Sequence, residues 1–344
     1  MRDDQLCIVT GNEVTRTLSG RELDVVAAVE AAYRAHQRGE SSLPHSTFLR
    51  FPGDDLNRII ALPAFLGDGY ELAGMKWVSS VPGNVARGME RASAVVILNS
   101  LRTGRPFALL EGSLISAQRT AASAALAARV LLRDGAPAAL GLLGTGVINR
   151  EIVRYLMALV PGIRRVVLFD LDPARAASFA EGLRRRWPGT EVEAASAVEP
   201  LLAECLLVSY ATTAVRPHLR DLSLCPERAV HLHVSLRDLT PEAILACDNV
   251  VDDPDHVCRA QTSVHLAEQL TGGRDFIRCS LGEILEGTAP PKRDEEAITI
   301  FSPFGLGILD LAVAKLVFDK AVVEGGAGIR ISSFFPSADR EDPA

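Results

Sequence analysis

The chain has 344 residues, enough for two domains, and its 48% hydrophobic and 23% charged residues are typical of a globular protein. Its net charge of −7 gives no support for nucleic acid or an anionic membrane as a partner, because both favour basic surfaces. No apolar run approaches the roughly 20 residues that span a bilayer, and the N-terminus lacks a signal-peptide pattern. We therefore expect a cytoplasmic protein.

The six cysteines are scattered, without a CxxC pair or a Cys/His cluster at zinc spacing, so we expect reduced thiols and no metal site. Most basic residues are arginine, which makes each lysine conspicuous. The lysines are Lys76, Lys292, Lys315 and Lys320.

The first predicted helix begins at Ser19-Gly20-Arg21-Glu22, which has the form of a capping box. Val26, Val29 and Tyr33 follow at helical spacing, and Gly39 is placed to end the helix. Short β-branched runs come next, separated by turn residues that include Pro63 and Gly67, and they predict an antiparallel sheet. The runs are Arg58 to Leu62, Leu72 to Val78, Ala94 to Leu98 and Pro106 to Leu110.

An alanine-rich helix is predicted from Leu114 to Leu132, and after Pro137 strands alternate with helices, which indicates βαβ units. These strands are Ala139–Leu143, Val166–Phe169, Cys205–Ser209, Ala229–Ser235, Val250–Val251 and Ile298–Phe301, before a last helix from Gly307 to Val323. We predict an α/β protein with a Rossmann-type parallel-sheet domain (126–302) and an α+β lobe for substrate binding and dimerisation (1–125 with 303–344).

The strongest motif is the strand Ala139–Leu143 followed by Gly144-Thr145-Gly146 and a helical pattern. Glycine suits this position because a pyrophosphate must approach backbone N–H groups at a helix N-terminus. The third glycine of the G-x-G-x-x-G motif is replaced by Asn149. Asp170 ends the next strand, where an acidic residue accepts hydrogen bonds from the ribose and repels a 2′-phosphate, so NAD is favoured over NADP.

Several charged residues are candidates for the active site. Lys76 lies in a strand that otherwise looks buried, which requires a charged partner, a bound anion or an amine that reaches the surface. Arg119, near the start of the alanine-rich helix, suits a phosphate or carboxylate, although a solvated arginine is an equal alternative. Asp238 follows the strand Ala229–Ser235, at the edge where ligands bind in open α/β sheets, but a plain loop aspartate is the alternative.

Arg50 and Arg91 are ambiguous in the same way, since each could form a surface ion pair. His231 and His233 alternate along one strand, with no evident partner, and we interpret them as structural.

Together these residues resemble the ornithine cyclodeaminase/μ-crystallin family over nearly the whole chain. The resemblance depends on Met75-Lys76-Trp77, Glu90-Arg91-Ala92-Ser93, residues 114–122, Gly144-Thr145-Gly146 and Ser235-Leu236-Arg237-Asp238. It implies a substrate-binding and dimer-forming N-terminal lobe, an NAD-binding Rossmann lobe and a homodimer. It also implies that Lys76 and Arg119 hold a substrate carboxylate and that Asp238 is the general acid/base.

From the motif and the resemblance we assign each residue a role. Catalysis is assigned to Asp238 and Lys76, and substrate binding to Arg50, Lys76, Arg91 and Arg119. Cofactor binding is assigned to Gly144, Thr145, Gly146, Val147, Ile148, Asp170, Arg119, Thr120 and Ser302.

Within the family, the chain looks most similar to the branch that oxidatively cleaves N-(2-amino-2-carboxyethyl)-L-glutamate to 2-oxoglutarate and L-2,3-diaminopropionate, a precursor of siderophores and peptide antibiotics. The carrying segments are residues 58–63, 89–99 and 301–305. Where ornithine cyclodeaminases have a glutamate facing the distal amine, this chain has Ile60, which would leave a buried ammonium without a counter-charge. A conjugate with three carboxylates instead suits the cationic lobe.

The expected reaction is hydride transfer to NAD followed by hydrolysis of the imine. The alternatives are ornithine cyclodeaminase, a ketimine reductase or alanine dehydrogenase, and a non-catalytic μ-crystallin-like binding protein.

Overall fold

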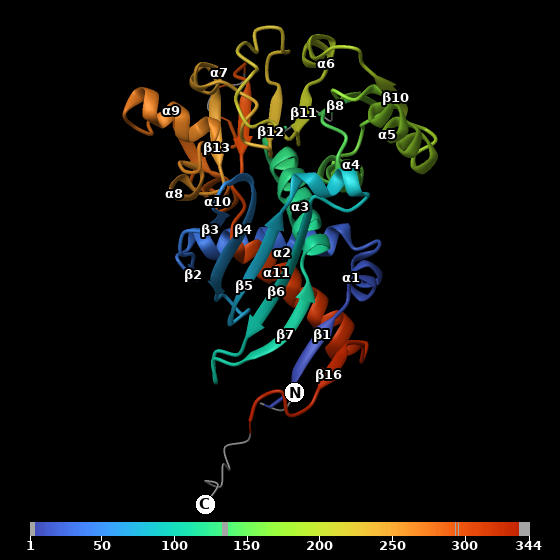
Figure 1. Ribbon diagram of the computed structural model, residues 1–344. Helices are drawn as coiled ribbons and strands as arrows, with labels where there is room; N and C mark the ends of the chain where they lie inside the picture. The colour runs from blue at the N-terminus through green and yellow to red at the C-terminus, as the bar shows by residue number, and fades with distance from the viewer. Residues whose placement is uncertain (1–3, 133–136, 293, 295, 337–344) are drawn as a thin grey trace, which may run out of the picture. The chain divides into compact units, whose positions relative to one another are not determined.

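The computed structural model describes residues 4–132, 137–292, 294 and 296–336. Its contacts divide the chain into two compact units (Figure 1). Unit 1 contains Met1–Arg119 and Leu306–Ala344, and unit 2 contains Thr120–Gly305. The last segment of the chain joins unit 1 because its strand pairs with the first strand of the protein.

Unit 1 is built on a mixed sheet in the order β16-β1-β7-β6-β5-β4-β2, with β3 paired to β4. The predicted antiparallel sheet is confirmed, since β4, β5, β6 and β7 pair in succession as antiparallel neighbours. The strands are β1 (Leu6–Val9), β2 (Ser41–Ser42), β3 (Thr47–Phe51), β4 (Asp54–Leu66), β5 (Leu72–Ser80), β6 (Ala92–Asn99), β7 (Pro106–Glu111) and β16 (Ile329–Ile331).

The sequence pattern predicts that Pro63 separates two strands. In the structure Pro63 instead lies inside β4, opposite Met75. On its other side, β3 pairs with β4 only as far as Ala61, and β2 pairs from Phe65. A residue without an N–H is tolerated here because no strand pairs with that position on this side.

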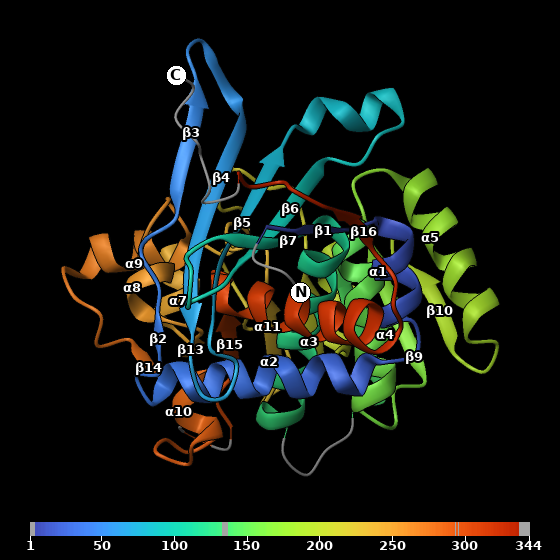
Figure 2. The same ribbon diagram turned by 90° about the horizontal axis from the view of Figure 1, so that it is seen from below.

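The central strands of unit 1 bury alternate residues. On β4, Leu62, Ala64 and Leu66 are buried, whereas Ala61 and Pro63 are half-exposed. The buried face packs against α11 (Gly307–Phe318), which contacts β4, β5 and β6 and continues into the π-helical turn η2 (Asp319–Glu324). The long helix α2 (Glu22–Gln37) lies beside α11, as Figure 2 shows. The sheet therefore has one covered face within this unit.

Helix α1 (Gly11–Leu18) precedes α2 and corrects the predicted first helix. Ser19 is the C-cap of α1, and α2 begins after Arg21 without a side-chain cap. The capping box instead lies at Thr10, whose backbone N–H donates to Glu13 at 2.7 Å. The 3-10 turn η1 (Pro82–Arg87) and α3 (Ser113–Leu131) complete the helical segments of unit 1, and α3 continues into unit 2.

Unit 2 is a parallel sheet in the order β10-β9-β8-β11-β12-β15-β13-β14, which confirms the predicted Rossmann-type domain. Its strands are β8 (Ala139–Leu143), β9 (Arg165–Phe169), β10 (Glu191–Ala194), β11 (Leu207–Tyr210), β12 (Val230–His233), β13 (Asp248–Val251), β14 (Ile277–Ser280) and β15 (Thr299–Ser302). Its helices are α4 (Val147–Leu159), α5 (Pro173–Arg186), α6 (Val198–Glu204), α7 (Pro241–Leu245), α8 (Pro254–Val257), α9 (Ser263–Thr271) and α10 (Leu281–Leu285). Within the described ranges, we find no helix long and apolar enough to cross a membrane.

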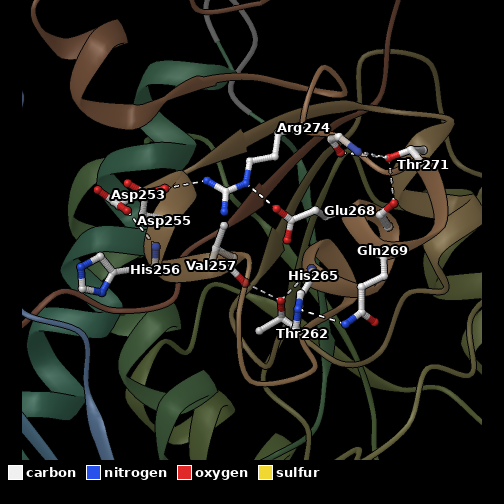
Figure 3. Close-up of polar contacts among 12 residues, drawn as sticks. Asp253, Asp255, His256, Val257, Thr262, His265, Glu268, Gln269, Thr271 and Arg274 are labelled. Atoms are coloured by element: carbon white, nitrogen blue, oxygen red, sulfur yellow. Dashed lines mark hydrogen bonds and ion pairs between the residues drawn. The ribbon is translucent and has the colours of Figure 1, made fainter.

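The polar residues after β13 hold the short helices α8 and α9 together (Figure 3). The Arg274 guanidinium lies 2.6 Å from the carboxylates of both Asp255 and Glu268. Thr262 caps α9 by accepting a hydrogen bond from the backbone N–H of His265. These side chains are used in helix ends and ion pairs, and in the described segments no cluster of three or more His, Cys, Asp or Glu side chains could hold a metal ion.

Candidate functional site

The glycine-rich loop joins β8 to α4 in unit 2. Gly144 has a φ of +85°, and a Cβ at this position would lie 2.6 Å from the Ala211 carbonyl oxygen. Gly146 is the N-cap of α4, and a Cβ there would meet no atom within 4 Å. The space beside Gly146 is therefore open at a helix N-terminus, where unpaired N–H groups attract an anion such as a pyrophosphate.

Asp170, at the end of β9, is linked directly to this loop. Its Oδ2 atom accepts hydrogen bonds from the Thr145 N–H at 2.8 Å and the Thr145 hydroxyl at 2.6 Å. Partial burial raises the pKa of Asp170, but these hydrogen bonds, one from the Asp172 N–H and the charge of Arg175 together outweigh burial and keep the pKa below its ordinary value. The carboxylate is thus ionised at neutral pH, as an acceptor for ribose hydroxyls must be.

Asn149, which departs from the glycine motif, fastens the loop. The buried side chain donates to the carbonyl oxygens of Leu143 at 2.9 Å and Gly144 at 2.6 Å, and it accepts from the Ser209 hydroxyl at 2.7 Å. A third glycine would permit a close contact between helix and strand. Asn149 instead joins them by these three hydrogen bonds. Of the other predicted cofactor residues, Val147 is exposed and Ile148 half-buried on the first turn of α4, and Thr120 is half-buried in α3.

Asp238 is fully buried beyond the carboxyl end of β12. The hydroxyls of Ser235 and Thr212 both donate to its carboxylate. Burial raises its pKa, but contact with His233 and these two hydrogen bonds outweigh burial and lower the pKa below its usual value. An ionised carboxylate acts as a base rather than as a proton donor.

His233 has a partner that the sequence does not reveal. Its Nε2 atom lies 3.5 Å from the Asp238 carboxylate and 3.2 Å from the Asp238 backbone N–H, which donates to it. Its Nδ1 atom faces the Ser302 hydroxyl at 3.3 Å. His233 is the last residue of β12 and Asp238 follows five residues later, so both lie at the carboxyl end of one strand, which is a signal for this contact.

His231 has a different role from its neighbour. It contacts the Tyr210 hydroxyl through Nδ1 at 2.6 Å, and complete burial lowers its pKa to about 3. This neutral, buried pair is structural, as the sequence indicates.

Unit 1 contains a buried ionic cluster, which we name the Asp310 cluster: Lys76, Arg119 and Asp310. The Lys76 Nζ lies 2.7 Å from one oxygen of Asp310, and the Arg119 Nε donates to the other at 3.1 Å. Lys76 Nζ also donates to the Ser116 hydroxyl at 3.0 Å. Lys76 is 3% exposed and Asp310 0%, so the predicted alternative of a lysine whose amine reaches the surface is wrong.

The charges of the Asp310 cluster do not balance, since two cations face one carboxylate. Burial, followed by the repulsion of Arg119, lowers the pKa of Lys76 to about 8 despite the attraction of Asp310. A buried surplus of positive charge is stabilised by a further anion. Sequence reasoning missed Asp310, although an aspartate inside the otherwise apolar run Ile308-Leu309-Asp310-Leu311 is a usable signal.

The other two predicted substrate residues lie on the same sheet. Arg50 is exposed on β3. Arg91 is half-buried just before β6, and its Nε donates to the Ser80 hydroxyl at 3.3 Å. The alternative of a surface ion pair does not hold for Arg91, which has no carboxylate within ion-pair distance among the described residues.

The fold and these two sets of residues define an α/β protein with a dinucleotide-type loop in one unit and a buried cationic cluster in the other. Residues 7–325 match the ornithine cyclodeaminase/mu-crystallin family, and the chain belongs to this family. The family prediction from the sequence is confirmed.

Three relatives are informative. N-((2S)-2-amino-2-carboxyethyl)-L-glutamate dehydrogenase of Staphylococcus aureus is 28% identical, over 86% of this chain and 89% of its own length. The Delta(1)-pyrroline-2-carboxylate reductase of Thermococcus litoralis, solved with NADH and L-proline, is 26% identical with a TM-score of 0.87, over 95% of this chain and all of its own. An archaeal alanine dehydrogenase dimer with bound NAD is 28% identical with a TM-score of 0.85, over 96% of this chain and all of its own.

Proposed function

We propose that this chain is an NAD-dependent dehydrogenase that cleaves N-(2-amino-2-carboxyethyl)-L-glutamate to 2-oxoglutarate and L-2,3-diaminopropionate. Diaminopropionate would supply the biosynthesis of a siderophore or a peptide natural product. The observation that carries the proposal is the positive surplus of the Asp310 cluster beside an apolar residue, Ile60, instead of a carboxylate.

The sheet register supports this choice of substrate. Ile60 pairs with Val78, and Lys76 lies two residues along β5, so both side chains belong to one face of the sheet. An isoleucine next to the cluster offers no counter-charge to a distal ammonium such as that of ornithine. A polycarboxylate meets cations there instead. A relative that acts on the conjugate shares 28% of its residues with this chain.

The residues that fit NAD are those of the glycine-rich loop. The open space beside Gly146 suits the pyrophosphate, and the ionised Asp170 suits the adenosine ribose hydroxyls rather than a 2′-phosphate. Relatives solved with NAD or NADH support this cofactor. NAD, when bound, supplies the acceptor for a hydride from the glutamyl α-carbon.

The chain's own residues then have separate tasks. Lys76 and Arg119 hold a substrate carboxylate and fix its orientation. Asp238, ionised and held by two hydroxyl donors, removes a proton from the water that adds to the carbon–nitrogen double bond of the oxidised substrate. The carbon–nitrogen single bond then breaks, the amine leaves with a proton as diaminopropionate, and the carbonyl product is 2-oxoglutarate.

We also propose that the protein is a homodimer that uses the open face of the unit 1 sheet. The face opposite α11 carries half-exposed or exposed apolar side chains on neighbouring strands. They are Ile59, Pro63, Met75, Trp77, Val95, Ile97 and Leu109. A contiguous apolar face of this kind is typical of a protein interface. A relative with the same fold is a dimer.

The test is the formation of NADH, followed by absorbance, when purified protein and NAD are mixed with the conjugate. Parallel cells contain ornithine or L-alanine, and one contains NADH with Delta(1)-pyrroline-2-carboxylate. NADH and 2-oxoglutarate in equal amounts from the conjugate alone would support the proposal. Proline and ammonia from ornithine, or turnover only of alanine or the pyrroline, would contradict it, and so would silence in every cell.

A further inference from the structure

Three arginines lie at or beside strand positions near Ser80, at the carboxyl end of β5. Arg50 pairs with Arg58 across β3 and β4, and Arg58 pairs with Ser80 across β4 and β5. Arg91 reaches the same point from the start of β6, because its Nε donates to the Ser80 hydroxyl at 3.3 Å. Directly opposed residues of antiparallel strands project from the same face, so Arg50 and Arg58 lie on the side of Ser80.

Arg50, Arg58 and Ser80, which we call the arginine row, lie on the same face of the unit 1 sheet as Lys76 of the Asp310 cluster. Ser80 and Lys76 are four residues apart on β5, and even spacing keeps their side chains on one side of the sheet. Four residues of strand correspond to about 13 Å between their Cα atoms. Lysine and arginine side chains are long enough for their charged groups to lie closer together than their Cα atoms, at the separation of two carboxylates within one small molecule.

The Asp310 cluster and the arginine row differ in how far helix α11 covers them. A Cβ on Gly307, the first residue of α11, would lie 3.1 Å from the Leu62 carbonyl oxygen. Because Leu62 pairs with Lys76, the helix begins close to Lys76. Further along the face, Ile60 and Val78 are half-buried, and so are Arg58 and Ser80. The arginine row therefore lies beyond the start of α11, next to the cluster.

The positive charge of Arg91, beside Ser80, favours the binding of an anion. Arg91 is half-buried, and burial lowers its pKa. Among the residues that the structure describes, its guanidinium has no carboxylate within ion-pair distance, and its hydrogen bond goes to a neutral hydroxyl. A half-buried guanidinium without a carboxylate partner is stabilised by a bound anion, and arginine is the side chain best suited to holding a carboxylate by two hydrogen bonds.

We propose that Arg58, Ser80 and Arg91 form a second carboxylate-binding site, the arginine subsite, which selects substrates with a carboxylate distal to the one held by Lys76 and Arg119. The inference rests on the proposed function, because it assigns the distal carboxylates of that substrate to named residues. Arg50, which is exposed, contributes long-range attraction from the edge of the subsite.

The experiment measures binding of two probes by calorimetry with NAD present: glutarate, with two carboxylates, and butyrate, with one. The variants are Arg58→Gln and Arg91→Gln, and Arg87→Gln, an exposed arginine in η1, is the matched control. We expect wild-type protein and the control to prefer glutarate, and each subsite variant to lose about tenfold to a hundredfold in glutarate affinity with little change for butyrate. With the conjugate, KM should rise more than kcat falls.

Glutarate affinity that stays at the wild-type level in a folded Arg58→Gln or Arg91→Gln variant would overturn the subsite, and so would a wild-type protein that binds both probes equally. The thermal unfolding midpoint identifies a variant that fails to fold, and the other variant then decides. If glutarate is preferred but the conjugate yields no NADH, the proposed function fails while the subsite remains.

Discussion

At the scale of single residues, the Asp310 cluster shows how one buried carboxylate can organise two cations for an anionic ligand. Asp310 contacts Lys76 and Arg119 through different oxygens, so both side chains are fixed before any substrate arrives. Its charge also offsets part of the burial and repulsion that lower the pKa of Lys76 to about 8. We therefore regard Asp310 as a positioning residue for these two cations.

Substrate binding should depend on pH through Lys76. The lysine must be protonated to hold a carboxylate, so kcat/KM should be level below pH 8 and fall above about pH 8. In Asp310→Asn, burial and Arg119 still lower this pKa, but the carboxylate that raises it is gone, so the fall should begin at lower pH. At pH 8 we expect a loss of about tenfold or more.

The control for this experiment is Asp319→Asn, which removes the partner of Lys315 in a half-buried pair of the same helical segment. Its pH profile should match that of wild type. An unchanged alkaline limb in folded Asp310→Asn would mean that Asp310 does not set the protonation of Lys76.

Asp238 should matter for turnover and not for the cofactor. Asp238→Asn keeps the shape of the side chain and removes the base, so we expect kcat to fall about a hundredfold or more. The dissociation constant for NAD, measured by fluorescence titration, should stay within about twofold, because Asp238 is separate from the glycine-rich loop. Equal losses of turnover and NAD affinity would contradict the assigned role.

Sequence reasoning at this scale succeeds where a residue type is out of place and fails where its partner is distant. Lys76 stands out because a lysine inside an apolar strand needs a reason. Its partner Asp310 is 234 positions further along the chain, and only the fold brings it within 2.7 Å. His233 looks structural in the sequence for a different reason: Asp238 is only five positions away, but the turn that brings it to the Nε2 atom of His233 is not visible in the pattern.

At the scale of elements, the glycine-rich loop contains one glycine that the fold requires, Gly144, and one that we assign to a ligand, Gly146. Gly146→Ala is allowed by its backbone (φ −85°) and meets no atom, so the fold should be unchanged. The added methyl group would occupy the space that we assign to the pyrophosphate. We expect a thermal unfolding midpoint within about 2 °C of wild type and NAD affinity reduced about tenfold or more.

Gly144→Ala is the matched comparison. Its positive φ and the 2.6 Å approach to the Ala211 carbonyl oxygen should destabilise the protein by about 1–3 kcal/mol. Unaltered NAD affinity in Gly146→Ala would show that the pyrophosphate binds elsewhere.

The elements themselves were predicted well where a periodic pattern was long, and poorly where the pattern was short or repeated. The strand β8 and the helix α3 agree with the sequence to within one residue, because continuous apolar and alanine-rich runs define them. The capping-box pattern, in contrast, fits both Thr10–Glu13 and Ser19–Glu22. The first forms, and its Glu13 also accepts a hydrogen bond from the Gly328 N–H at 2.8 Å, a distant contact that no local pattern contains.

At the scale of the whole molecule, the edge of the unit 1 sheet could not be predicted either, because its strands are short and their partners are distant in sequence. Strand β1 has four residues, and it pairs with β7 on one side and with β16 on the other. Both partners are remote in sequence, and neither β1 nor β16 is long enough to show alternation. The fold class was therefore predictable from the motifs and the order of elements, whereas the closure of the sheet by the last strand was not.

The open face of this sheet leads to a prediction about assembly. Trp77 lies at its centre, 39% exposed although tryptophan is usually buried, with Ala61 and Val95 as its cross-strand neighbours. In a dimer formed through this face, Trp77→Arg would bury a charge at the interface and should weaken association by about 30-fold or more. Light scattering coupled to size-exclusion chromatography at about micromolar protein should give a dimer for wild type and a monomer for the variant.

Leu23→Arg is the control, since Leu23 is 62% exposed on α2, which packs beside α11 on the covered side of the sheet. This variant should stay dimeric, because its charge enters water and not the interface. A wild-type protein that is monomeric at every concentration, or a Trp77→Arg protein with the wild-type mass, would mean that the apolar face serves some other contact. Dimerisation through this face would also explain why its strands carry apolar residues on both sides, a pattern that a sheet exposed to water on one side does not show.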